Sequence, residues 1–130
     1  MKIALCLGLN SENKRGLDFF FEGIIGGLAQ IDAENEYSLF SYFFKDFETK
    51  RRALPQPSRA NFRLDVRRWP SSLVDRLEHA GVPVIDRLFT RPGGFDVFHS
   101  LSGYLSAARQ AKTIVTVHDL MPEVFYRQAL

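Results

Sequence analysis

Side chains able to do acid–base chemistry follow two apolar segments of the chain. His118 and Asp119 come directly after the β-branched run 113–117, and His99 follows the short run 95–98. An imidazole can donate or accept a proton near neutral pH, and a carboxylate can orient a hydroxyl group. These three residues are therefore candidates for a binding or catalytic site. Structural roles remain open as well, with Asp119 as a helix N-cap and both imidazoles satisfied by backbone groups.

A polar loop follows the first apolar run. In this loop Lys14 and Arg15 precede Gly16, which stands at the start of a helical pattern. Backbone N–H groups beside a glycine at a helix start can approach a phosphate or a sugar, so these residues are candidate substrate contacts. The segment has no G-x-G-x-x-G motif, which excludes a dinucleotide fingerprint. A plain strand-to-helix loop is the alternative.

The order of apolar patterns predicts an α/β domain. Continuous apolar runs are typical of strands buried on both faces of a parallel sheet, and apolar residues at helical spacing indicate helices between them. We expect one Rossmann-like domain over residues 1–130, with a mostly parallel sheet and helices on both faces. The expected strands are 2–9, 34–44, 62–66, 95–100 and 112–119, and the expected helices are 17–30 and 71–81.

Two details of these elements bear on function. Ligands of such sheets bind outside the carboxyl ends of the strands, so His118, His99 and the loop before Gly16 should meet at one rim. We expect the strand that leads to His118 to be buried. In the helix 71–81, Ser71 or Ser72 is the expected N-cap.

Composition excludes several classes of function. A net charge of +2 gives no argument for nucleic acid, and no apolar stretch is long enough to cross a membrane. The single Cys6 excludes an intrachain disulfide and a multi-cysteine metal site, and it suits a small core position. We therefore predict a cytoplasmic protein with no metal and no cofactor.

The middle of the chain is basic. Residues 45–91 hold eleven Lys or Arg against six Asp or Glu, a local excess of five positive charges. With aromatic residues nearby, this segment suits contact with an anionic membrane surface or with a phosphorylated acceptor. A solvated face is the simpler alternative.

The segments FDVFHS (95–100) and AKTIVTVHDLMPEVF (111–125) resemble the N-terminal half of retaining family 4 glycosyltransferases, which have the GT-B fold. The resemblance runs over the whole chain and is strong over about residues 95–126. It implies transfer of a sugar from a nucleotide-diphosphate or lipid-phosphate donor to an acceptor hydroxyl, with retention at the anomeric carbon. His118 then matches the catalytic histidine that reaches the donor sugar, and Gly16 matches a glycine near the donor phosphates. Asp119 would orient the acceptor or its loop.

The resemblance also implies what the chain needs in order to act. Its partners would be a nucleotide-sugar donor, a sugar or lipid-linked acceptor, and a C-terminal donor-binding domain in cis or in trans. We expect that domain to lie outside these 130 residues, so the chain alone should be inactive. Family members often carry GIGRY-like residues where this chain reads GLDFF (16–20), and the missing arginine is a departure at the phosphate contact.

Two other functions remain open from the sequence. The chain could be a stand-alone Rossmann-like or flavodoxin-like binding module that has no catalytic role. It could also be a hydrolase that uses His118 and Asp119 with Ser100 as nucleophile, although it has no G-x-S-x-G motif.

Overall fold

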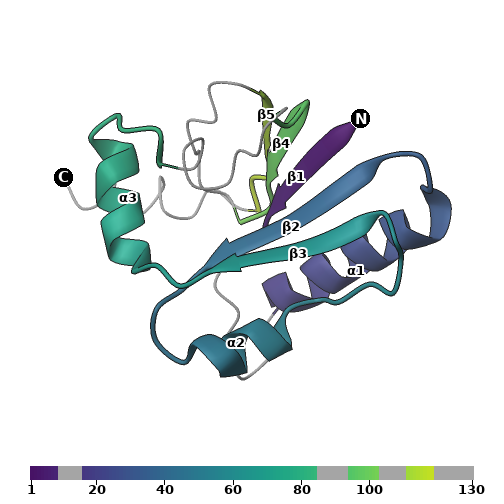
Figure 1. Cartoon of the computed structure of the whole chain (residues 1–130), viewed down its shortest axis with the longest axis horizontal. Coiled ribbons are helices and arrows are strands. Elements are labelled where there is room, and N and C mark those ends of the chain that lie inside the picture. Colours follow the sequence, from purple (N-terminus) through teal and green to yellow (C-terminus); the bar gives the residue numbers. More distant parts are fainter. Residues whose placement is uncertain (9–15, 85–93, 103–110, 119–130) are drawn as a thin grey trace.

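The computed structural model describes residues 1–8, 16–84, 94–102 and 111–118, which form a parallel five-stranded sheet flanked by helices (Figure 1). The strand order is β3-β2-β1-β4-β5. This is the order of the first five strands of a Rossmann fold, so the predicted α/β class is confirmed. The strands are β1 (Lys2–Cys6), β2 (Glu36–Tyr42), β3 (Phe62–Arg67), β4 (Val97–Ser100) and β5 (Lys112–Val115), and the helices are α1 (Gly16–Ile31), α2 (Phe47–Ala53) and α3 (Ser71–His79).

Helices lie against both faces of the sheet (Figure 1). Strand residues alternate between the faces, so Leu5 packs toward α1 while its neighbours Ala4 and Cys6 face the other side. On the α1 face, Phe21 of the helix lies in the same cluster as Leu5. The opposite face carries a smaller cluster around Phe40. Each buried aromatic or large aliphatic side chain of these clusters contributes roughly 1.5–3 kcal/mol.

Two local predictions are wrong. Pro70, with φ of −63°, is the N-cap of α3, and no side chain caps this helix. Ser71 is therefore the first helical residue, because the Pro70 carbonyl accepts the first helical backbone N–H groups, those of Leu73 (3.1 Å) and Val74 (3.2 Å). The second error concerns β5, which ends at Val115 and is mostly exposed. Its β-branched residues indicated a strand correctly, but this propensity does not distinguish a central strand from one at the edge of the sheet.

The turn between α1 and β2 is built around the carboxylate of Asp32. One oxygen accepts the backbone N–H groups of Glu34 (2.9 Å) and Asn35 (3.0 Å). The other accepts the Asn35 side-chain amide and the Tyr37 hydroxyl, both at 2.6 Å. The Asn61 amide donates to the carbonyls of Asp32 and Asn35, which ties this turn to the start of β3.

These hydrogen bonds change the acidity of both partners. The hydroxyl of Tyr37 and the amide and backbone of Asn35 hold the pKa of Asp32 well below its ordinary value. Burial, with the Asp32 carboxylate as a second cause, raises the pKa of Tyr37 to about 12. The turn is therefore assembled with Asp32 charged and Tyr37 neutral.

Because the pKa of Asp32 is lower in the folded state, its stabilising effect is present above the unfolded value of about 3.9 and is lost as pH falls. We predict that Asp32→Ala lowers the urea midpoint of unfolding at pH 7, and that the difference from the unmutated chain shrinks below about pH 4. The matched control is Glu34→Gln, whose side chain lies beside the turn and should leave the midpoint unchanged. A difference that stays constant down to about pH 2 would contradict this role of the carboxylate.

Candidate functional site

The order of the strands reverses at β1, which pairs with β2 on one side and with β4 on the other. The chain leaves β1 through Leu7 and Gly8, and it leaves β4 through Leu101 and Ser102. A Cβ on Gly8 would lie 2.9 Å from the Cβ of Ser102, so only glycine fits there. The two strands therefore leave the sheet in close contact, at the place where ligands of such sheets usually bind.

His118 lies at this place. Its Nε2 is 2.7 Å from the carbonyl oxygen of Leu101. Its ring meets the edge of Phe20 of α1, with ring centroids 4.9 Å apart at 88°. A carbonyl only accepts, so Nε2 carries the proton and Nδ1 holds the lone pair of the neutral ring. Among the described residues no hydrogen bond reaches Nδ1, and the side chain is exposed.

The segment that carries His118 is held by His99. The register pairs His99 with Ile114, and strand alternation then puts Ile114, Thr116 and His118 on the α1 side. His99 Nε2 lies 2.8 Å from Thr116 Oγ1, and the Thr116 backbone N–H donates to the carbonyl of Ser100 at 2.9 Å. Burial lowers the pKa of His99. The geometry gives His99 a positioning role behind His118.

The first turn of α1 already carries negative charge. Gly16 is the first residue of the helix and is exposed, and a Cβ there would meet no atom of the described residues within 4 Å. Asp18 lies in the same first turn and is 6% exposed. The N-terminus of a helix has a positive potential that stabilises negative charge. A carboxylate placed there offsets this potential, so an anionic ligand is attracted less strongly.

The site residues predicted from sequence therefore separate into three groups. His118 and His99 are brought near the β1–β4 exit, and Gly16 opens the helix that carries Phe20. Lys14, Arg15 and Asp119 lie outside the described residues. Sequence reasoning missed two contacts of His118, namely Phe20 and the Leu101 carbonyl. Alternation along 114–118 could have identified Thr116, but no local pattern marked Phe20.

The geometry does not favour the hydrolase alternative. Ser100 pairs in register with Cys6 and faces away from α1, whereas His99 and His118 face toward it. The Ser100 hydroxyl is buried, and within the described ranges it has no hydrogen-bond partner. A serine on the opposite face from the imidazoles cannot transfer its proton to either.

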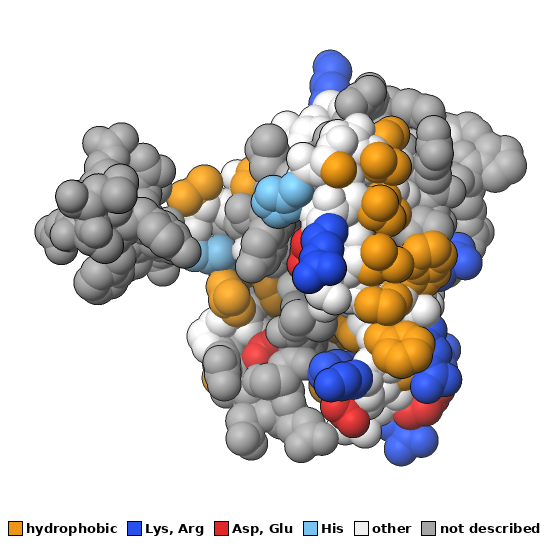
Figure 2. Space-filling view, turned by 90° about the vertical axis from the view of Figure 1, so that its left-hand side faces the viewer, with side chains coloured by type: hydrophobic (Ala, Val, Ile, Leu, Met, Phe, Trp, Pro, Cys, Tyr) orange, Lys and Arg blue, Asp and Glu red, His pale blue; other side chains and the backbone are white. Residues whose placement is uncertain are grey.

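A basic cavity of about 220 Å³ lies at the carboxyl end of β2. Lys45 and Lys50 line it beside the start of α3, and Arg68 lies over the ring of the exposed Phe44 at 5.5 Å. Figure 2, seen from the side on which α3 lies, shows a band of hydrophobic side chains with Lys and Arg next to it. The cavity is lined by Phe43, Phe44, Lys45, Lys50, Pro70, Ser71 and Ser72.

Three further observations limit the kinds of function that can be assigned to the site. In residues 1–8, 16–84, 94–102 and 111–118, His, Cys, Asp and Glu side chains form no group of three suited to a metal ion. Over the same ranges, no helix is long and apolar enough to cross a membrane. Comparisons with family models, with curated proteins and with solved structures found no match. The function must therefore be inferred from the chain's own residues.

The lowered pKa of His99 has a measurable consequence. Because burial disfavours the charged ring, we predict that His99 titrates below the ordinary value of about 6.5, so its stabilising effect is lost as pH falls below that value. A pH titration of the imidazole proton and carbon resonances by NMR measures this midpoint. A His99 midpoint at or above 6.5 would contradict its burial behind Thr116.

Proposed function

We propose that this chain is the acceptor-side, N-terminal part of a retaining glycosyltransferase of the GT-B type. It would act with a second, donor-binding domain in cis or in trans, and move a sugar from a nucleotide-diphosphate donor to an acceptor hydroxyl. The observation that carries this proposal is His118 at the β1–β4 exit, with Nε2 bound to the Leu101 carbonyl and, among the described residues, no hydrogen bond at Nδ1. The resemblance of residues 95–125 to that family supports the same assignment.

The proposed role of His118 follows from its hydrogen bond. The Leu101 carbonyl fixes the orientation of the ring and leaves Nδ1 as an acceptor for a sugar hydroxyl. Phe20, edge-on to the ring, restricts its rotation. A group held in this way can stabilise charge that develops on the transferred sugar without reorganising during the reaction.

The charges at the rim support the binding of donor and acceptor by two different domains. The leaving diphosphate needs cations or free helix N-termini, and the first turn of α1 instead contains the buried Asp18. This favours binding of the diphosphate by the second domain and binding of the acceptor by this one. With half of the cleft, the chain alone cannot exclude water or orient both substrates.

The basic cavity supports an acceptor that bears phosphate or lies in an anionic membrane. Lys45 and Lys50 supply positive charge, and the exposed Phe44 supplies an apolar contact beside them. The last turn of α2 adds Arg51 and Arg52. We therefore place the protein at the inner face of the cytoplasmic membrane, held by electrostatic attraction to acidic lipids.

The first test is His118→Ala in the protein combined with its donor-binding domain. We expect kcat to fall about 100-fold or more, because a preorganised group that acts on the transition state is lost. His79→Ala is the matched control, since His79 is an exposed imidazole on α3 whose one hydrogen bond within the described ranges is to the Asp75 carbonyl, and kcat should stay unchanged. Full activity of His118→Ala, or turnover by the 130-residue chain alone, would refute the proposal.

The second test concerns the membrane. We predict that Lys45→Gln with Lys50→Gln weakens binding to phosphatidylserine vesicles about 25-fold, since each basic residue near the surface contributes roughly 1 kcal/mol. Binding is measured by co-sedimentation at low salt. The control is Lys112→Gln, an equal loss of charge per residue on exposed β5. If Lys112→Gln weakens binding as much, per charge removed, as the double variant does, then net charge alone attracts the chain to the vesicle.

A further inference from the structure

A second cavity lies at the opposite edge of the sheet from His118. Its volume is about 510 Å³, within the range of small-molecule sites. Lys2 and Glu36, the first residues of β1 and β2, border it, so it opens at the amino ends of these strands. The lining residues are Lys2, Glu36, Tyr37, Ser38, Ala60, Asn61, Arg63, Gly94 and Phe95.

The polar side chains of this cavity share one face of the sheet. Register pairs Lys2 with Glu36, and Ser38 with Arg63. Strand alternation places all four on the face away from α1. Ser38 is 8% exposed and its hydroxyl accepts a hydrogen bond of 3.1 Å from the Arg63 guanidinium. The guanidinium is therefore anchored by a buried hydroxyl at the floor of the cavity.

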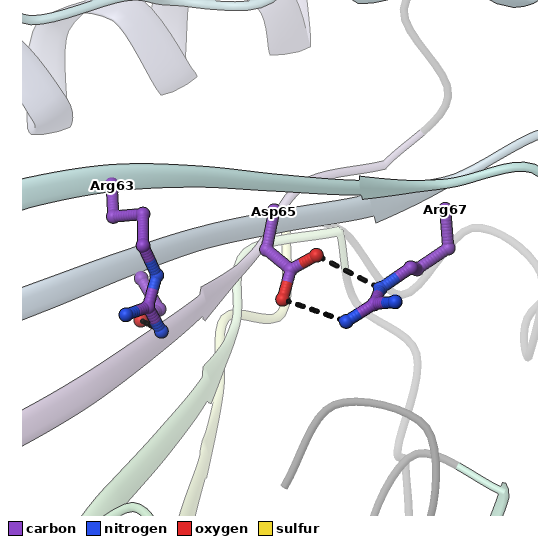
Figure 3. Close-up of polar contacts among 4 residues, drawn as sticks. Arg63, Asp65 and Arg67 are labelled. Atoms are coloured by element: carbon purple, nitrogen blue, oxygen red, sulfur yellow. Dashed lines mark hydrogen bonds and ion pairs between the residues drawn. The ribbon is translucent and has the colours of Figure 1, made fainter. Parts of the chain in front are cut away.

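Arg63 is not neutralised by the acid nearest to it on β3. Figure 3 shows Arg63, Asp65 and Arg67 projecting to the same side of the strand, with Asp65 joined to Arg67. The two contacts of that pair are 2.9 Å and 3.4 Å, which is a two-pronged ion pair. Among the described residues, Arg63 bonds only Ser38, and neither the Lys2 ammonium nor the Glu36 carboxylate has a partner.

The wall of the cavity is apolar and fixed. Phe95 lies between the cavity and the core cluster that contains Phe40 and Phe98. The next residue, Asp96, accepts the Lys2 backbone N–H at 2.7 Å and donates its own backbone N–H to the Lys2 carbonyl at 2.9 Å. The aromatic wall and the Lys2 backbone are thus held together, which reduces the ordering that ligand binding requires on this side of the cavity.

We propose that this cavity binds a sugar phosphate. The planar guanidinium of Arg63 and the ammonium of Lys2 suit a phosphate group. A phosphate monoester carries up to two negative charges, and these two cations together can balance them. The Glu36 carboxylate and the Asn61 side-chain oxygen are acceptors for sugar hydroxyls, since the Asn61 N–H groups already bond the Asp32 and Asn35 carbonyls. The ring of Phe95 offers an apolar surface for the C–H face of the sugar. Because the cavity lies at the amino edge, this site is separate from the rim that carries His118.

The experiment titrates the 130-residue chain with glucose 6-phosphate by isothermal titration calorimetry. We expect saturable binding that Arg63→Gln weakens about tenfold or more, because a charge-assisted pair is lost. The matched control is Arg76→Gln, which removes the same charge at an exposed position of α3 outside the cavity and leaves the Asp65–Arg67 pair intact, and it should change affinity less than about twofold. Thermal unfolding of each variant shows whether the fold is kept.

Two competing ligands and one further variant test the specificity of the cavity. Glucose should bind more weakly than glucose 6-phosphate, because it lacks the phosphate that Arg63 and Lys2 would contact. Inorganic phosphate should compete weakly, because it lacks the sugar. His118→Ala should leave the affinity unchanged, so that failure of the proposed transferase and failure of this site are told apart. Absence of saturable binding at about 10 mM ligand, or equal weakening by Arg63→Gln and Arg76→Gln, would overturn the proposal.

Discussion

The pairing of β4 with β1 is the constraint on which the rest of the structure depends. β2 already occupies one side of β1, and β4 adds to the other side in register with Ile3 through Cys6. The Asp96 carboxylate and backbone fix the start of this pairing at Lys2. At its end, Gly8 and Ser102 approach so closely that no larger residue fits at position 8. One pairing therefore brings together the ends of β1 and β4 beside His118 at the carboxyl edge and fixes the wall of the cavity at the amino edge.

The chemistry proposed for the carboxyl edge would depend on a strand with little burial of its own. β5 has four residues and is mostly exposed, and the imidazole of His118 lies on the chain that follows it. Two contacts outside the ladder hold that chain, His99 with Thr116 and His118 with the Leu101 carbonyl. Both histidines thus act through their Nε2 atoms on neighbouring segments. The difference is that His99 is partly buried, whereas His118 is exposed.

Much of the architecture could be predicted from the sequence, because it depends on short-range patterns. The apolar runs at β1 and β2 and the spacing of Phe21 and Ile25 in α1 are visible in single segments. Edge position and capping were not predictable in this way, since they depend on which segments become neighbours. The amino-edge cavity was invisible for the same reason. Its residues come from four separate stretches of the chain, and only strand register brings Ser38 beside Arg63.

The most direct test of a sugar-binding rim at His118 is to locate ligand contacts by NMR. Amide and imidazole shifts of the isotope-labelled chain would be followed during titration with a panel of nucleotide-diphosphate sugars and candidate acceptor sugars. We expect the largest changes from at least one member to fall on Gly8, Leu101, Ser102 and His118, and His118→Ala to remove them. No shift at these positions with any member, or shifts that survive His118→Ala, would contradict a sugar-binding role for this rim.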